Sequence, residues 1–443
     1  MWWMSVALAG PVEELEAYAF PEQSQNDIEE RLGVRTDGLL IVQGGEVVYE
    51  RYANGYGADT PHLLWSATKT FTNVLIGLAV SDGRLAIEDS ICDYVSVPHP
   101  EHCDIRVVDL LEFSSGLDWR ETYEGDPPTT STVIAMLYGA GRDDMAAYVA
   151  GTPRRTEPGG TWQYSSGDTN LLAAVVQAAM EPTHGADFAW TMLFEPLGME
   201  SVVWERDAAG TMIGSSYGYA TPRDLARFGE FLLNEGEGML PEGWVHDSVQ
   251  VAPSIRASTV DRDPFDTNGR QIWVNLPVPE QGEVGPPLPS APLDTYSARG
   301  HWKQGLFVIP SEDLVIVRTG DDRDGSFSWD ELLRLSLAVA AVEVEPAPAG
   351  AGGVTAANTS SLSRDEEMGL LGLGTGYGSK MACSCRYVMG MDEDFCRAWV
   401  KASPDIVKIR FSDEDKTATA KAVGMKKTSA SWQGERGGCT HDP

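Results

Sequence analysis

Ser66 and Lys69 are the two residues of this chain whose types and spacing point most directly to chemistry. Lys69 and Lys303 are the only lysines among residues 1–342, where arginine otherwise supplies the positive charge. A desolvated lysine can lose its proton and act as a base, whereas arginine keeps its proton in a protein. A serine hydroxyl becomes a good nucleophile when an adjacent base takes its proton. The pair therefore predicts a nucleophilic serine with a lysine base.

The chemistry requires a helix that presents both side chains together. Apolar residues at helical spacing predict a helix from about Ala67 to Gly83, and side chains three residues apart share a helix face. A helix start also offers free backbone N–H groups, which suit a developing oxyanion. The alternative is structural: Ser66 would cap the helix and Lys69 would be solvated.

Two later segments strengthen the catalytic interpretation. Tyr164-Ser165-Ser166 directly precedes a predicted helix, and Gly300-His301-Trp302-Lys303-Gln304 directly precedes a predicted strand. In this order the three segments resemble the S-x-x-K, Y-x-N and K-T-G or H-x-G elements of the serine hydrolases related to penicillin-binding proteins and class C β-lactamases. The resemblance covers about residues 15–342 and is strongest to the nylon-oligomer (aminohexanoate-dimer) hydrolase and esterase branch. Other segments that resemble the family are His62–Ser66, Asp109–Trp119, Tyr219–Gly229 and Pro310–Arg318.

The resemblance implies a role for each matching residue. Ser66 would be acylated, and Lys69 would take or share its proton. Tyr164, hydrogen-bonded to both, would relay a proton to the leaving group and help to activate water. The backbone N–H groups of Ser66 and Gln304 would form the oxyanion hole. The residues expected to support these groups or bind substrate are His301, Tyr123, Ser166 and Trp302.

The chain departs from the family pattern at two positions. Ser166 stands where the family has the asparagine of Y-x-N, and a shorter serine disfavours recognition of a β-lactam amide. Lys303 replaces the glycine of H-x-G, so its side chain must point away from the cleft if the oxyanion hole is to stay open.

A competing nucleophile is Ser216, in the G-x-S-x-G motif Gly214–Gly218. Such an elbow needs a strand before the serine and a helix immediately after it. The preceding residues form a poor strand and the next helix is predicted only from Pro222, so we do not expect Ser216 to be the nucleophile.

The leading functional hypothesis is therefore a serine hydrolase that cleaves an ester or an amide through a Ser66 acyl-enzyme, with linear amide oligomers among the candidate substrates. A D-alanyl peptidase or a β-lactamase is the alternative within the same fold. A hypothesis of another class is a non-catalytic binding or scaffold module. No metal or dinucleotide motif is present, so no cofactor is expected.

The predicted elements indicate an α/β fold of the α+β type, with a β-lactamase-like antiparallel sheet flanked by helices and a helical subdomain. Predicted strands lie near both ends of residues 1–342 and helices lie between them. The strands are Gly38–Gln43, Glu46–Tyr52, Gln271–Asn275, Gln304–Ile309 and Leu314–Arg318, and the clearest helices are Asn170–Met180, Pro222–Leu233 and Ser328–Val342.

The composition changes after this hydrolase-like region. Residues 343–378 are rich in Pro, Gly, Ala and Ser and are predicted to be a linker. Residues 379–443 are predicted to form a small cysteine-containing domain of unknown role, with a hairpin of Ile406–Phe411 and Thr417–Val423.

The six cysteines favour disulfides and export to the periplasm or the outside of the cell, although zinc binding in a cytoplasmic protein is the alternative. His99 and His102 lie in a proline-containing loop between Cys92 and Cys103, which favours a cysteine-bounded loop over a metal site. The apolar start, residues 1–10, is either the remnant of a signal peptide or a strand or helix.

The net charge of −33 disfavours nucleic acids and anionic membranes as partners. No apolar run is long enough to span a membrane. The expected partner is a small ester or amide substrate, and the sequence does not predict an oligomeric state.

Overall fold

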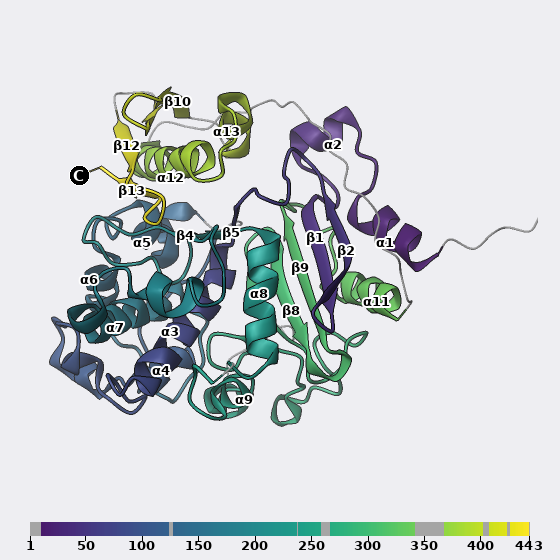
Figure 1. Ribbon diagram of the computed structural model, residues 1–443. Helices are drawn as coiled ribbons and strands as arrows, with labels where there is room; N and C mark the ends of the chain where they lie inside the picture. The colour runs from purple at the N-terminus through teal and green to yellow at the C-terminus, as the bar shows by residue number, and fades with distance from the viewer. Residues whose placement is uncertain are drawn as a thin grey trace, which may run out of the picture.

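The computed structural model describes residues 10–123, 127–236, 238–257, 266–341, 367–401, 407–422 and 426–442. Residues 1–9, which include most of the apolar start, lie outside this range. The centre of the fold is a six-stranded antiparallel sheet in the order β2-β1-β9-β8-β7-β6 (Figure 1). The strands are β1 (Thr36–Gln43), β2 (Glu46–Tyr52), β6 (Trp273–Val274), β7 (Tyr296–Gly300), β8 (Gln304–Ile309) and β9 (Leu314–Gly320).

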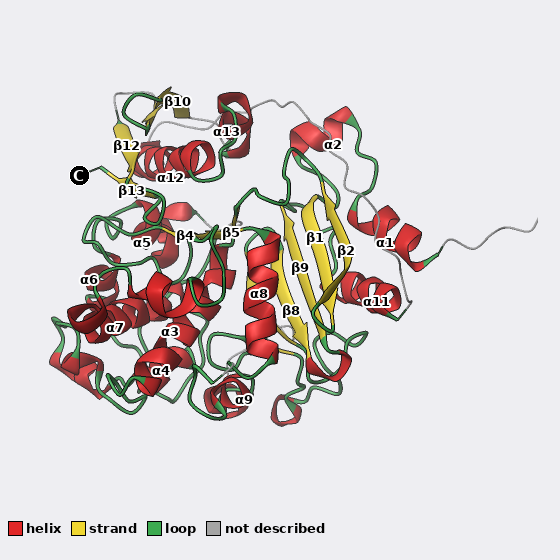
Figure 2. Ribbon diagram, viewed as in Figure 1, coloured by secondary structure: helices red, strands yellow, loops and turns green. Residues whose placement is uncertain are grey.

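Alternating side chains of the central strands enter two different cores. Leu39 and Ile41 of β1 face one core, together with residues of α1 and α11. Leu40 and Val42 face the other core, which extends into the helical region. Because successive side chains of a strand point to opposite faces, a strand covered on both sides becomes almost continuously apolar. Helices α1 and α11 therefore cover one face of the sheet, and α8 and the helical region cover the other (Figure 2).

Most helices lie between the early and late strands of the sheet. The helices of the first 341 residues are α1 (Pro11–Ala19), α2 (Gln25–Glu30), α3 (Lys69–Ser81), α4 (Val107–Leu111), α5 (Thr132–Tyr138), α6 (Met145–Ala150), α7 (Ser166–His184), α8 (Pro222–Leu233), α9 (Trp244–Ser248), α10 (Pro253–Ala257) and α11 (Trp329–Ala340). Thr221 caps α8 by accepting a hydrogen bond from Asp224 N, as its position before Pro222 predicts.

A second, three-stranded sheet lies beside α3 and has the order β3-β5-β4. Its strands are β3 (His62–Leu63), β4 (Val203–Trp204) and β5 (Gly218–Ala220). Strand β3 leads directly into a 3₁₀ helix, Trp65–Thr68, and then into α3. This small sheet therefore fixes the start of the segment that carries Ser66 and Lys69.

The described residues between 367 and 442, which we call the C-terminal unit, form two helices and a four-stranded antiparallel sheet. The elements are α12 (Glu367–Tyr387), α13 (Glu393–Trp399), β10 (Val407–Ser412), β11 (Thr417–Ala422), β12 (Lys427–Trp432) and β13 (Cys439–His441). The predicted hairpin corresponds to β10 and β11, which are paired. Helix α12 begins inside the segment 343–378 that the composition indicates as a linker. The unit packs on α5 and on the segments next to β4 (Figure 1).

All six cysteines are within disulfide distance in pairs, which confirms the expectation of disulfides. The pairs are Cys92–Cys103, Cys383–Cys439 and Cys385–Cys396. Two of them lie in the C-terminal unit and one closes the loop that holds His99 and His102. None of the described helices combines the length and the apolar character that crossing a bilayer demands.

Candidate active site

Ser66 and Lys69 are in direct contact, as their spacing predicts. Lys69 Nζ lies 3.0 Å from Ser66 Oγ. It also donates to Ser166 Oγ at 2.9 Å and to the carbonyl of Ser215 at 3.1 Å. Ser66 itself lies in the 3₁₀ helix and Lys69 is the first residue of α3, so the tighter turn rather than an α-helical turn brings the two together.

Lys69 is buried, and its ammonium group loses its proton more readily than that of an exposed lysine. Its exposed fraction is 2%, and burial lowers the pKa of Lys69 from its ordinary value to about 8, while the charge of Glu121 opposes that shift. A neutral amine in this place can accept the proton of Ser66 and still donate to Ser166 and to the Ser215 carbonyl. The arrangement is therefore suited to general-base activation of Ser66.

Tyr164 lies beside this pair, directly before α7. Lys69 Nζ is 4.9 Å from the centre of the Tyr164 ring. The phenol interacts with Ser66, but burial outweighs this contact and raises the pKa of Tyr164 above its ordinary value. The lysine thus faces the ring of Tyr164, where the resemblance implies a hydrogen bond to its hydroxyl. A phenol with a raised pKa keeps its proton near neutral pH and can pass it on as a donor.

Glu121 is the site residue that the sequence did not single out. Its Oε1 accepts hydrogen bonds from Ser166 Oγ at 2.6 Å and from the Tyr123 hydroxyl at 3.0 Å. Its Oε2 accepts from Trp119 Nε1 at 2.6 Å and from Ser166 N at 2.9 Å. Ser166 consequently links the carboxylate of Glu121 to the amine of Lys69.

The position of Glu121 offered only a weak sequence signal. The residue follows the family-like segment that ends at Trp119 and is 45 positions from Ser166 along the chain. A glutamate between two aromatic residues of a loop is common on protein surfaces. The residue type of Glu121 therefore does not identify it as part of a site.

A cluster of aromatic side chains adjoins Trp65, the residue before Ser66, and Ser66 itself is partly exposed. Tyr123 and His301 are stacked with their ring centres 5.0 Å apart. Trp65 contacts His301 at 5.5 Å and Trp302 at 5.3 Å, edge to face. His301 thus lies against Tyr123 and the tryptophans, and the structure brings Tyr123, His301 and Trp302, which are expected to bind substrate, together beside Trp65. Tyr164 stacks on Trp273 at 5.3 Å.

The turn between β7 and β8 is pressed against the segment that carries Ser66. A Cβ atom at Gly300 would lie 2.1 Å from the carbonyl oxygen of Leu64, so only glycine allows this approach. Trp302 and Lys303 have positive φ angles of 54° and 67°, and Gln304 pairs with Gly300 across the turn. The turn therefore holds Gln304, the expected second oxyanion donor, on the strand adjacent to Ser66.

Lys303 is partly buried, next to Trp302 in the same turn. Burial lowers its pKa, and the nearby charge of Asp322 opposes that shift. Asp322 is buried and paired with Arg318 at 2.6 Å. The charges that act on Lys303 thus include both Asp322 and Arg318, which pair with each other, and the expectation that its side chain points away from the cleft stays a prediction.

Ser216 lies in a context that does not suit a nucleophile elbow. It is buried, and the motif is followed by strand β5 instead of a helix. Its neighbour Ser215 contributes to the site through a backbone carbonyl, the one that accepts from Lys69. The G-x-S-x-G segment thus contributes a backbone acceptor to the surroundings of Lys69.

Metal binding finds little support in the described part of the chain. No group of three or more His, Cys, Asp or Glu residues there could hold a metal ion. His99 and His102 have ring centres 4.9 Å apart, but they lie in the disulfide-closed loop, where burial lowers the pKa of His102.

The antiparallel sheet, the helical region and the serine–lysine pair at the start of α3 define a β-lactamase-like serine hydrolase. A family model described as Beta-lactamase matches residues 25–340. The chain belongs to this family and is a hydrolase.

Known proteins resemble the chain in sequence or in fold. The chain is 27% identical over 346 residues to 6-aminohexanoate-dimer hydrolase of Paenarthrobacter ureafaciens, which covers 70% of this chain and 78% of that protein. EstCE1, described as a hydrolase with promiscuous acyltransferase activity, has a TM-score of 0.55 at 16% identity, over 74% of this chain and 98% of that one. The octameric penicillin-binding protein homologue from Pyrococcus abyssi has a TM-score of 0.52 at 15% identity, over 95% of this chain and 90% of that one. At these identities the two structures show a shared fold.

Proposed function

We propose that this protein hydrolyses an ester or a linear amide through an acyl-enzyme on Ser66. The observation that carries the proposal is the buried Lys69, held 3.0 Å from Ser66 Oγ with a pKa lowered to about 8. Lysine with an ordinary pKa would be charged at neutral pH and would be a poor base. The 6-aminohexanoate-dimer hydrolase similarity favours linear amides among the candidate substrates.

In the acylation step, Ser66 Oγ attacks the substrate carbonyl carbon while its proton passes to Lys69 Nζ. The negative charge on the carbonyl oxygen would be stabilised by the backbone N–H groups of Ser66 and Gln304, at about 3–4 kcal/mol per donor. The carbon–oxygen or carbon–nitrogen bond to the leaving group then breaks. The leaving group takes a proton from the Tyr164 hydroxyl, and Lys69 returns one to Tyr164. This return requires the Lys69 amine, which faces the Tyr164 ring, to move to the hydroxyl.

In the deacylation step, a water molecule attacks the acyl carbon of the ester on Ser66. Its proton passes back through Tyr164 and Lys69, and Ser66 leaves as a hydroxyl. Every proton that the cluster takes up in one step is returned in the other, so no external acid or base is consumed. The cluster of aromatic side chains that adjoins Trp65, including Tyr123, His301 and Trp302, would contact the acyl group or the leaving group.

The alternative of a β-lactamase or D-alanyl peptidase receives less support from the site. Ser166 occupies the family asparagine position, but its hydroxyl is committed to Lys69 and Glu121. Serine has no side-chain amide, and the bonded hydroxyl of Ser166 is not available to replace one in binding a β-lactam side chain. The intact Ser66–Lys69 contact also argues against a non-catalytic scaffold.

The decisive experiment compares wild type with Ser66→Ala on a short-chain p-nitrophenyl ester, a linear 6-aminohexanoate dimer and a penicillin. We expect turnover of the ester or the amide by wild type and none by the variant. Labelling of wild type by a fluorophosphonate, mapped to Ser66 by mass spectrometry, checks the acyl-enzyme directly. Activity retained by Ser66→Ala would refute the proposal, and turnover of penicillin alone would support the alternative.

A further inference from the structure

A buried ion pair joins the C-terminal unit to the region matched by the family model. Lys380 Nζ of α12 lies 2.7 Å from Glu205 Oε2, and the two side chains are 2% and 0% exposed. Ser384 Oγ also donates to Glu205 Oε1 at 2.6 Å, and Cys439 N donates to the same atom at 2.9 Å. Loss of one partner from a fully buried ion pair strongly destabilises the folded protein, because the other charge is left buried and uncompensated. The C-terminal unit is thus firmly docked at this point.

The contacts continue from Glu205 to Tyr217. Glu205 N donates to the carbonyl of Tyr217 at 3.1 Å. Lys380 Nζ lies 4.9 Å from the centre of the Tyr217 ring, and the Tyr217 hydroxyl contacts Met381 Sδ at 3.4 Å. The same hydroxyl donates to the hydroxyl of Tyr138 at 2.7 Å. The C-terminal unit therefore holds both the ring and the hydroxyl of a fully buried tyrosine.

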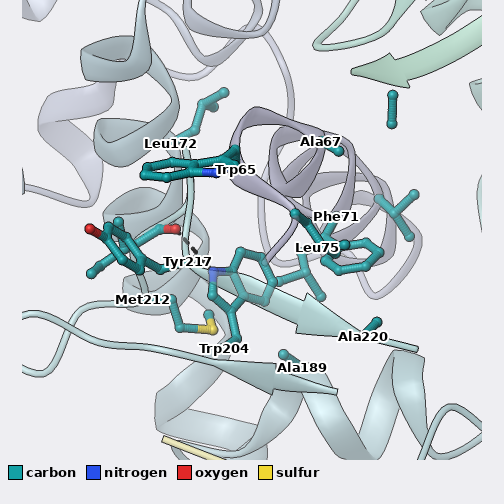
Figure 3. Close-up of a cluster of buried hydrophobic side chains, with 14 of the residues drawn as sticks. Trp65, Ala67, Phe71, Leu75, Leu172, Ala189, Trp204, Met212, Tyr217 and Ala220 are labelled. Atoms are coloured by element: carbon teal, nitrogen blue, oxygen red, sulfur yellow. Dashed lines mark hydrogen bonds between the residues drawn. The ribbon is translucent and has the colours of Figure 1, made fainter. Parts of the chain in front are cut away.

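Tyr217 has an unusual backbone conformation. Its φ is 58°, in the left-handed region. For a bulky residue this conformation costs about 1–3 kcal/mol and persists only where the surroundings enforce it. Trp65, directly before Ser66, has a φ of 49°, and its ring centre lies 5.9 Å from that of Tyr217. Figure 3 shows Trp65 and Tyr217 in one cluster with Trp204, whose neighbour is Glu205.

These two strained residues adjoin the groups that would carry out catalysis. Trp65 is bonded to the nucleophile Ser66. Tyr217 is two residues after Ser215, whose carbonyl accepts a hydrogen bond from Lys69 at 3.1 Å. A change in the backbone at Tyr217 would withdraw that carbonyl from the amine.

We propose that Lys380 and Met381 of the C-terminal unit are positioning residues of the hydrolase site. This proposal rests on the function proposed above and gives the C-terminal unit a role in catalysis. The unit holds Tyr217 in its left-handed conformation. It thereby keeps the Ser215 carbonyl in contact with Lys69 and keeps Trp65 packed next to Ser66.

The proposal predicts a defined change at Lys69 when the ion pair is broken. Lys380→Met leaves Glu205 buried without its cation, and the segment that includes Tyr217 should shift. Loss of the Ser215 carbonyl removes an acceptor that stabilises the charged amine, so the pKa of Lys69 should fall. Misplacement of the base should also slow acylation of Ser66 by about 10- to 100-fold.

The test uses the full chain and two readouts. The pKa of Lys69 is measured by NMR titration of protein with isotope-labelled lysine, in which Lys69→Met identifies the signal. The acylation rate is measured with a fluorophosphonate at a pH well above the wild-type Lys69 pKa of about 8, where Lys69 is neutral in every variant and its pKa no longer affects the rate. The temperature is one at which near-ultraviolet circular dichroism shows every variant folded. Lys416→Met is the matched control, because Lys416 lies over Trp432 within the C-terminal unit, 3.5 Å from the ring centre.

We expect Lys380→Met to lower both the Lys69 pKa and the acylation rate, and Lys416→Met to change neither. Lys380→Met combined with Glu205→Gln removes the uncompensated charge and should restore part of both. A Lys380→Met protein that melts at a lower temperature but keeps the wild-type Lys69 pKa would overturn the positioning role. The titration needs no turnover, so it decides this proposal even if Ser66 fails to label and the proposed function is rejected.

Discussion

Replacing Glu121 by glutamine tests the electrostatics of the site most directly. The hydrogen bonds from Lys69 to Ser166 and from Ser166 to Glu121 measure 2.9 and 2.6 Å, so the amine and the carboxylate are separated by one hydroxyl. Opposite charges about 5 Å apart attract by about 3 kcal/mol at an effective dielectric constant of about 20, which corresponds to about two pKa units. The Glu121 charge raises the pKa of Lys69, against the larger effect of burial. Its removal should therefore lower that pKa.

The assay is the pH dependence of kcat/KM for a p-nitrophenyl ester, which reports the ionisation of the free enzyme. Activity should rise as Lys69 loses its proton, with a wild-type midpoint near the pKa of about 8. At pH 7 about 9% of such amines are neutral, against about 0.03% at the ordinary lysine pKa. In Glu121→Gln the rising limb should move down by about one to two pH units. The plateau should fall as well, because Ser166 and Tyr123 lose a charged acceptor.

The matched control is Glu312→Gln, which makes the same charge change on an exposed turn beyond the far end of β8 from Gln304. Its rising limb should coincide with that of wild type. A Glu121→Gln limb that also coincides with wild type would refute the coupling between Glu121 and Lys69. A limb displaced to higher pH would refute its sign.

Three further predictions follow from contacts at the site and in the C-terminal unit. Tyr164→Phe should lower kcat by about 100-fold or more with little change in KM, because a proton relay acts mainly in the transition state; equal kcat values would exclude the relay. Gly300→Ala should lower kcat by about 100- to 1,000-fold, because the added Cβ displaces the turn that carries the oxyanion donor. Gly285→Ala is the control and should leave kcat and KM unchanged, because a Cβ there meets no atom within 4 Å. Replacing Cys383 and Cys439 by alanine should reduce the free energy of unfolding by about 4 kcal/mol, measured by denaturant titration, since the disulfide spans 56 residues; an unchanged midpoint would contradict this.

The sequence predicted those parts of the site that local geometry determines. Three-residue spacing brought Ser66 and Lys69 together, and Thr221-Pro222 marked the start of α8 correctly. Glu121 could not be found in this way, because its contacts with Ser166 form only when a loop folds over the start of α7. The division into domains at 343 and 379 stays a prediction, although helix α12 crosses the second boundary.

Helix α12 shows why composition can mislead. Its sequence contains several glycines, which are poor helix formers in isolation, and the sequence therefore did not predict a helix there. Close packing provides the physical reason for the helix. A Cβ at Gly376 would lie 2.5 Å from the carbonyl oxygen of Tyr138, and one at Gly378 would lie 3.2 Å from Ile409 Cδ1. The glycines let α12 approach its neighbours, and tertiary packing outweighs propensity.

The buried Lys380–Glu205 pair also sets an order of events during synthesis. Residues 25–340, the part matched by the family model, leave the ribosome before Lys380 does. Glu205 would then have no cation, at a cost of about 3–5 kcal/mol if it were buried. At about 5–20 residues per second, translation needs about 5–20 seconds to reach Cys439 from the end of that region. With the positioning role proposed for Lys380, a nascent chain that already contains Ser66, Lys69 and Tyr164 would become active only after this later segment has been translated.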